Sequence, residues 1–155
     1  MEIILNASLA GGVACGANAD IIIAPYGAML LGFLTGAISS FGFAYLSKIL
    51  QDTINLHDTC GVHNLHGMPG VIGGLVSAII VSRGQANFGS NFGSEFLAEG
   101  RSARENAGYQ LAGLGLTLGL SIVAGLFTGW LTSRPFFLPV PVNNFFDDQY
   151  HWENC

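Results

Sequence analysis

Four stretches of predominantly apolar residues alternate with short polar segments along the chain. They cover residues of about 3–18, 26–46, 55–81 and 108–132. A helix needs about 20 mostly apolar residues to cross the hydrocarbon core of a bilayer. The pattern therefore predicts an all-α membrane protein with four transmembrane helices, of which the first is short.

Charged residues and prolines define the expected ends of these helices. Asp20 and Pro25 separate the first two stretches, and Lys48 with Asp52 predicts a polar loop after the second. Pro69 lies inside the third stretch, where the missing N–H favours a kink in the axis. We expect the transmembrane part to occupy residues 1–134 and a cytosolic tail to occupy residues 135–155.

The composition excludes several classes of protein. Charged residues make up 10% of the chain, whereas soluble domains carry about 25%. The net charge of −5 argues against nucleic acid as a partner. The three cysteines are an odd number at scattered positions, so they indicate no disulfide framework. The lipid bilayer is the partner that this composition predicts.

Glycine is frequent, with 22 residues, and it recurs at four-residue spacing in every apolar stretch. Small residues at this spacing allow transmembrane helices to approach closely. We therefore expect tightly packed helix pairs along these positions. The pairs are Gly12/Gly16, Gly32/Gly36, Gly70/Gly74, Gly115/Gly119 and Gly125/Gly129.

The residues with the richest chemistry lie between Asp58 and Gly70, at the head of an apolar run. An imidazole inside such a segment is either paired within the protein or lines a polar pathway. His66 therefore has two interpretations. Its imidazole is packed and satisfied by a backbone carbonyl, or it lines a pore and handles protons or small polar solutes.

A metal site is a weaker interpretation of the same segment. His63 and His66 are three residues apart, so on an α-helix they share a face, but zinc needs further ligands. We therefore predict no metal, no cofactor and no enzymatic activity, and a membrane metalloenzyme is the least favoured class. Structural roles are favoured for His57 and His63. Asp58 suits the first turn of a helix, where a carboxylate caps amides and complements the helix dipole.

The segment Asp58-Thr59-Cys60-Gly61, followed by Asn64-Leu65-His66-Gly67 and Pro69-Gly70, resembles a signature of the Rh glycoproteins in the ammonium transporter/Rh superfamily. The resemblance covers the C-terminal part of a family member. It implies that the four helices belong to an ammonium-transporter-like fold of roughly 11–12 helices built from inverted repeats. Three further blocks agree in order and spacing, namely Asn6–Val13, Pro25–Ala28 and Gly108–Leu114.

The resemblance implies transport of ammonia or ammonium, with carbon dioxide as a further candidate solute. His66 matches one member of a pair of imidazoles that line the hydrophobic pore, and its partner would come from the other repeat. Asn64 and Leu65 would lie at the cytosolic approach, with His63 also along the pathway. Asp58 would attract ammonium at the cytosolic mouth.

The resemblance also implies a homotrimer or a heterotrimer with other Rh subunits, in the plasma membrane, with a cytosolic C-terminus. The alternative is a non-conducting Rh-like subunit that supports a membrane complex. Half of an inverted repeat cannot enclose a pore between two halves. We therefore expect the 155-residue chain to be part of a larger protein and not to conduct alone.

Overall fold

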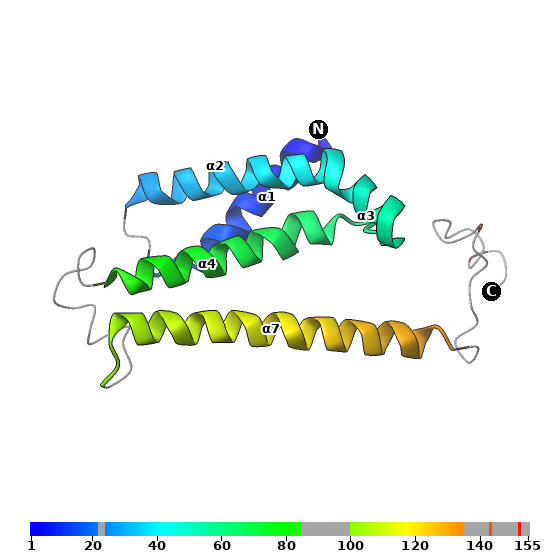
Figure 1. The fold of residues 1–155 in the computed structure, drawn as a ribbon. Coiled ribbons are helices and arrows are strands. Elements are labelled where there is room, and N and C mark those ends of the chain that lie inside the picture. Colours follow the sequence, from blue (N-terminus) through cyan, green and yellow to red (C-terminus); the bar gives the residue numbers. More distant parts are fainter. Residues whose placement is uncertain (22–23, 85–99, 135–142, 144–151, 153–155) are drawn as a thin grey trace. The chain divides into compact units, whose positions relative to one another are not determined.

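The computed structural model describes residues 1–21, 24–84, 100–134, 143 and 152, and the elements assigned there are helices (Figure 1). The chain divides into two units, residues 1–115 and 116–155, and each is described by itself. In chain order the elements are α1 (Glu2–Gly16), α2 (Pro25–Phe41), η1 (Gly42–Leu46), α3 (Ser47–Ile54), η2 (His63–Gly67), α4 (Met68–Ser82) and α7 (Ala103–Thr132).

Within the described residues, three helical runs are long and apolar enough to cross a membrane. They span Pro25–Ile54, His63–Ser82 and Ala103–Thr132. The first predicted span corresponds to α1, whose 15 residues rise only about 22 Å at 1.5 Å per residue. That length falls short of a hydrocarbon core of about 30 Å. Three of the four predicted spans thus have the length of a membrane helix, and the first is a shorter apolar helix.

The polar loop expected around Lys48 and Asp52 is helix instead. Both residues are exposed in α3, and their four-residue spacing places them on one helix face. The backbone hydrogen bonds of the helix continue past them. The helix ends one turn later at Asn55, which adopts a left-handed conformation with φ 58°. The third helical run therefore starts after residues 55–61 rather than near Asn55 as predicted.

The helices α1 and α2 pack antiparallel with their backbones in contact. A Cβ atom on Gly11 would lie 3.0 Å from the carbonyl oxygen of Gly32, and one on Gly36 would lie 2.9 Å from that of Ala7. The side chain of Cys15 continues this register by donating a hydrogen bond to the Ala28 carbonyl at 3.5 Å. The facing pairs are Ala7 with Gly36, Gly11 with Gly32, and Cys15 with Ala28.

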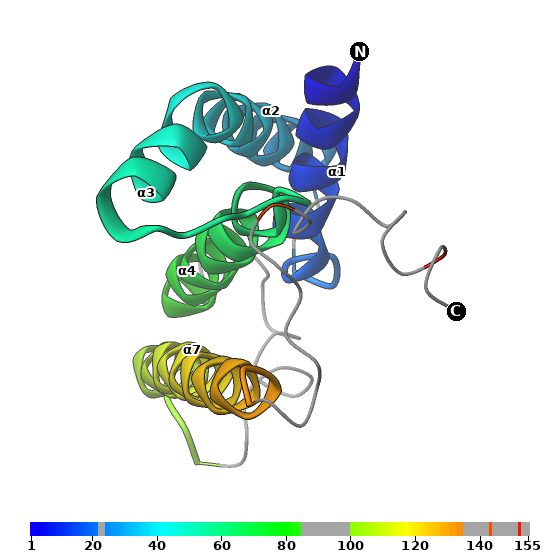
Figure 2. The same ribbon diagram turned by 90° about the vertical axis from the view of Figure 1, so that its right-hand side faces the viewer.

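The helix α1 lies beside both α2 and α4, as the end view shows (Figure 2). Its contact with α4 is made by Gly73, where a Cβ atom would lie 2.6 Å from the carbonyl oxygen of Ala14. Asn18, just beyond α1, is completely buried and donates to the carbonyl oxygens of Ala14 at 3.0 Å and Gly73 at 3.1 Å. One amide therefore ties the end of α1 to the middle of α4.

The first part of α7 packs against α4 within the same unit. Ser77 Oγ donates to Gln110 Oε1 at 2.7 Å, and Gly74 faces the side chain of Leu114. A small apolar cluster lies at the adjoining helix ends. It contains Ile21, Ala78, Val81 and Ala107, with Ile80 against it.

The predicted glycine pairs describe this packing only in part. Gly36 is tightly approached as expected, but Cβ atoms on Gly12 and Gly70 would meet nothing within 4 Å. Approaches to the backbone of another helix about as close as that at Gly36 also occur at Gly11 and Gly73, which the four-residue pattern did not select. The pattern thus identified close helix packing, while the neighbouring glycine in two helices makes the contact.

Small side chains are buried in this structure, and large apolar side chains are exposed. Ala10, Ala14 and Ala78 are buried, whereas Phe33 and Met29 are each 74% exposed. Water-soluble proteins bury most of their large apolar side chains. Exposed large apolar side chains and small residues at helix contacts are the arrangement expected for helices surrounded by lipid or by further helices.

Candidate functional site

The histidine segment opens its helix with a single π-helical turn. In η2 the backbone N–H of Met68 donates to the carbonyl of His63, five residues earlier. In η1 the N–H of Ser47 donates to the carbonyl of Gly42 in the same way. Single π turns are rare and occur often at functional sites. Pro69 is the second residue after η2, so its missing N–H falls where the hydrogen-bond register changes back to α.

The two π turns contact each other through the residues that close them. Ser47 closes η1, and its Oγ accepts a hydrogen bond from Asn64 Nδ2 in η2 at 2.6 Å. Met68 closes η2, and its methyl carbon would lie 2.7 Å from a Cβ atom placed on Gly42, the first residue of η1. Asn64 Oδ1 would also collide with such a Cβ atom. A side chain at position 42 would therefore displace the side chains of Asn64 and Met68.

Asn64 is buried between these turns rather than exposed along an open face. Its relative exposure is 0%, and Asn64 Oδ1 has no hydrogen-bond partner among the described residues. A buried polar atom without a partner costs about 1–3 kcal/mol. Asn64 is therefore held in an energetically demanding position by its packing against η1.

His63 and His66 are both exposed, and Leu65 is half-buried. The expectation that the two histidines share a face assumed α-helical spacing. In a π turn each residue advances less around the axis, so residues three apart diverge and residues four apart come closer to alignment. Accordingly, His63 Nδ1 lies 3.4 Å from the place of a Cβ atom on Gly67. The structure thus presents His66 separately from His63.

The carboxylate of Asp58 caps the start of this helical run. Its Oδ1 accepts from the N–H of Val62 and its Oδ2 from the N–H of His63, each at 2.9 Å. Gly61 between them has φ 67°, a left-handed conformation that glycine adopts easily. The predicted capping role of Asp58 is confirmed, and it fixes the first turn that carries the two histidines.

The described residues hold no group of three His, Cys, Asp or Glu side chains close enough to bind a metal ion. His57 lies in the segment before the helix and makes an interaction of its own. The candidate site therefore consists of two exposed imidazoles and a capping carboxylate at the start of an apolar helix.

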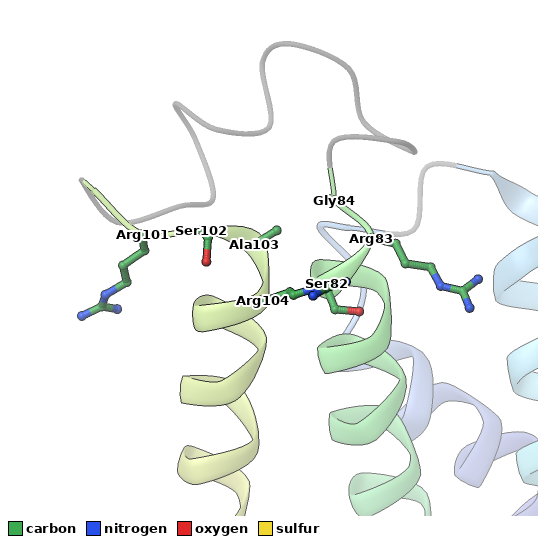
Figure 3. A pocket seen from close by; sticks show the side chains of 7 residues that line it. All are labelled: Ser82, Arg83, Gly84, Arg101, Ser102, Ala103 and Arg104. Atoms are coloured by element: carbon green, nitrogen blue, oxygen red, sulfur yellow. The ribbon is translucent and has the colours of Figure 1, made fainter.

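A pocket of about 380 Å³ lies where the C-terminal end of α4 meets the N-terminal end of α7, away from the histidine segment. Figure 3 shows that the side chains of Arg83 and Arg101 point away from each other, while Arg104 extends toward Ser82. The guanidinium of Arg101 lies over the ring of Tyr109, 4.2 Å from its centroid. Because the three arginines do not converge on one point, we assign no binding role to this pocket.

Long apolar helices that pack through small residues and expose large apolar side chains define an integral membrane protein. Comparison with known proteins gives the family. The model of the Ammonium Transporter Family matches residues 1–151. The chain belongs to this family, and the resemblance found in the sequence is confirmed.

The similar proteins are Rh-type ammonium transporters. Ammonium transporter Rh type B of Danio rerio is 38% identical over 97% of this chain and 34% of its own length. Rh type B of Oryzias latipes and Rh type C of Xenopus laevis are each 41% identical over 97% of this chain and 33% of their own lengths. The chain thus spans about a third of the relatives that it matches.

The sequence analysis missed the two π turns and two residues that hold them, Gly42 and Ser47. The only signal near them was Pro69, which indicated an irregular helix without giving its form. Neither Gly42 nor Ser47 carries a chemical group that stands out in an apolar helix. They become visible only when their contact with Asn64 is known.

Proposed function

We propose that the complete protein moves ammonia or ammonium across a membrane through a narrow hydrophobic pore lined in part by His66. The observation that carries the proposal is the family match together with the exposed imidazole of His66 at the head of an apolar helix. Carbon dioxide is a second candidate solute. The partner imidazole belongs to the other repeat of the family fold.

The physical basis is the cost of charge in hydrocarbon. An ammonium ion surrounded by apolar walls is destabilised by several kcal/mol or more, whereas neutral ammonia avoids this penalty. A neutral imidazole offers one ring nitrogen to the solute while the other is held by its partner imidazole. His66 therefore accepts a hydrogen bond, or a proton, at the point where the solute has lost its water.

Neighbouring residues receive related roles in the proposal. Leu65 is half-buried beside His66 and narrows the cytosolic approach, and His63 is exposed one position before Asn64. Asp58 attracts ammonium at the cytosolic mouth in addition to capping the helix. Asn64 forms part of the wall behind this approach, because its own amide is bound to Ser47.

The proposed assembly is a trimer of pore-containing subunits, homomeric or with other Rh subunits, in the plasma membrane. All four apolar helices cross or enter the bilayer, including the short α1. The proposed orientation places Lys48 and Arg134 in the cytosol, together with the tail from residue 135 onward, which lies outside the described residues apart from positions 143 and 152. Arg83, Arg101 and Arg104 then lie outside the cell.

Substitution of His66 tests the function directly. Full-length protein in proteoliposomes is compared with His66→Ala and His66→Asp variants by stopped-flow ammonia permeability and by methylammonium uptake. We expect His66→Ala to change the rate or the preference between the two solutes by about tenfold, which corresponds to 1.4 kcal/mol. His57→Ala, on the segment before the helix, is the matched control. Unchanged rates and preference in both His66 variants would contradict the proposal.

A lack of flux in the unmodified full-length protein would instead favour the non-conducting subunit.

The orientation has a separate test because Cys60 is free and exposed next to Asp58. With every other cysteine of the full-length protein replaced by serine, a membrane-impermeant thiol reagent should label Cys60 only after cells are permeabilised. Labelling of Cys60 in intact cells would reverse the orientation.

A further inference from the structure

The two π turns contact each other at two points. Each turn is closed by a residue that touches the other turn, Ser47 touching Asn64 and Met68 lying over Gly42. A π turn is a rare local state, so it persists when surrounding contacts hold it. Each of these turns therefore supports the other.

We propose that Asn64 and Gly42 are positioning residues that hold η2 in its π form and thereby set the direction in which His66 points. Asn64 and His66 belong to the same five-residue turn, with Asn64 completely buried and His66 exposed. If this turn relaxed to α-helical spacing, the residues before and after it would rotate relative to each other about the helix axis. The imidazole would then leave its place while the helix itself remained.

The buried amide of Asn64 carries this proposal because packing alone does not explain it. Its Nδ2 donates a hydrogen bond to Ser47 Oγ. Its Oδ1 lies against Gly42 and has no hydrogen-bond partner among the described residues. An apolar side chain of similar size would fill the same space without an unpaired oxygen. The amide is explained by the one hydrogen bond that fixes η2 to the end of η1.

The contact also links two membrane helices. Gly42 and Ser47 belong to the run Pro25–Ile54, whereas Asn64 and Met68 belong to the run His63–Ser82. A movement of the first run relative to the second would therefore be transmitted through Asn64 and would change the position of the His66 imidazole. The direction of the imidazole is determined by both helices, and the proposed role of Asn64 is indirect rather than contact with the solute.

The test uses full-length protein and rests on the proposed function only for its transport arm. Gly42→Ala places a methyl group against Asn64 and Met68, and Asn64→Ala removes the amide that binds Ser47. Gly70→Ala is the matched control, because a Cβ atom there meets nothing within 4 Å. We expect Gly42→Ala and Asn64→Ala each to lower ammonia permeability about tenfold, and the double variant Gly42→Ala/Asn64→Ala to lower it by much less than the product of the two effects, as coupling between contacting residues requires.

A second measurement separates positioning from general damage. The imidazole resonances of His66, assigned by their loss in His66→Ala, should shift in Gly42→Ala and in Asn64→Ala, with the melting temperature nearly unchanged. Ser47→Ala removes only the hydrogen-bond acceptor and should shift the same resonances less, which serves if Gly42→Ala does not fold.

Gly42→Ala behaving like Gly70→Ala, or lower flux without a shift of the His66 resonances, would overturn the positioning role. If His66→Ala leaves permeability unchanged, the proposed function fails instead. The His66 resonances then still decide whether Gly42 and Asn64 determine the position of the imidazole.

Discussion

Asn18 donates a hydrogen bond to the backbone carbonyl of Gly73 at 3.1 Å, and the two residues are 55 positions apart in the chain. The same Nδ2 atom donates to Ala14, so one buried amide connects two helices at the point where Gly73 lets their backbones meet. This amide is the clearest polar contact between α1 and α4.

We therefore expect Asn18→Ala to destabilise the protein. Side-chain hydrogen bonds between membrane helices contribute about 0.6 kcal/mol on average and up to about 1.7 kcal/mol. Because both bonds are lost, the free energy of unfolding in an SDS titration should fall by about 1–2 kcal/mol. Asn6→Ala within α1 is the control, and equal losses in the two variants would contradict the assigned contact.

The contact between α1 and α2 makes a sharp prediction for two adjacent glycines. Gly11→Ala forces its methyl group against the backbone of Gly32, which has no side chain to move aside. The free energy of unfolding should fall by about 1–3 kcal/mol, as for other overpacked sites. Gly12→Ala should be neutral or slightly stabilising, since its Cβ atom meets nothing. A larger effect at Gly12 would show that the helix faces are assigned wrongly.

The hydrogen bond between Ser77 and Gln110 predicts energetic coupling between α4 and the first part of α7. A double-mutant cycle of Ser77→Ala and Gln110→Ala, measured by unfolding in SDS, should give an interaction energy of about 0.6 kcal/mol and at most about 1.7 kcal/mol. Additive effects of the two substitutions would mean that the 2.7 Å contact does not contribute to stability.

The capping by Asp58 predicts a loss of stability when its carboxylate is removed. Asp58→Ala leaves the N–H groups of Val62 and His63 without their acceptor and should cost about 0.5–2 kcal/mol. The melting temperature of full-length protein measures this loss. Asp52→Ala, at an exposed position of α3, is the control. Equal melting temperatures for the two variants would contradict the capping role.

The 155-residue chain alone should not carry ammonia. His66 is exposed on this chain, and the repeat that would close a pore around it is expected elsewhere in the complete protein. Liposomes that contain only this chain should therefore show the ammonia permeability of empty liposomes in stopped-flow measurements. A clear increase would show that these helices enclose a pathway by themselves.

The long helices could be predicted because hydropathy is a local property of the chain. The boundaries at Pro25, Ser82 and Thr132 lie within one or two residues of the expected ones. Lys48 and Asp52 misled the prediction because polar residues end an apolar stretch without ending a helix. What continues the helix there is its backbone hydrogen bonding, which hydropathy does not report.

The site could be predicted only at the level of residue types. The family resemblance suggested a place for Asn64 along a pathway, but its burial depends on Ser47 and Gly42, which lie on another helix. The π spacing that separates His63 from His66 depends on the same tertiary contact. A pattern read along one helix carries no information about such a partner.

The distribution of side chains described above has a consequence for natural variation in this protein. Exchanges among leucine, isoleucine, phenylalanine and methionine on the outer surfaces, such as those of Met29 and Phe33, should accumulate freely wherever lipid is the neighbour. At Gly11, Gly36 and Gly73, by contrast, a single added methyl group presses on the backbone of a neighbouring helix and alters the spacing of the two helices. Inherited changes that impair the protein should therefore be concentrated at its smallest residues.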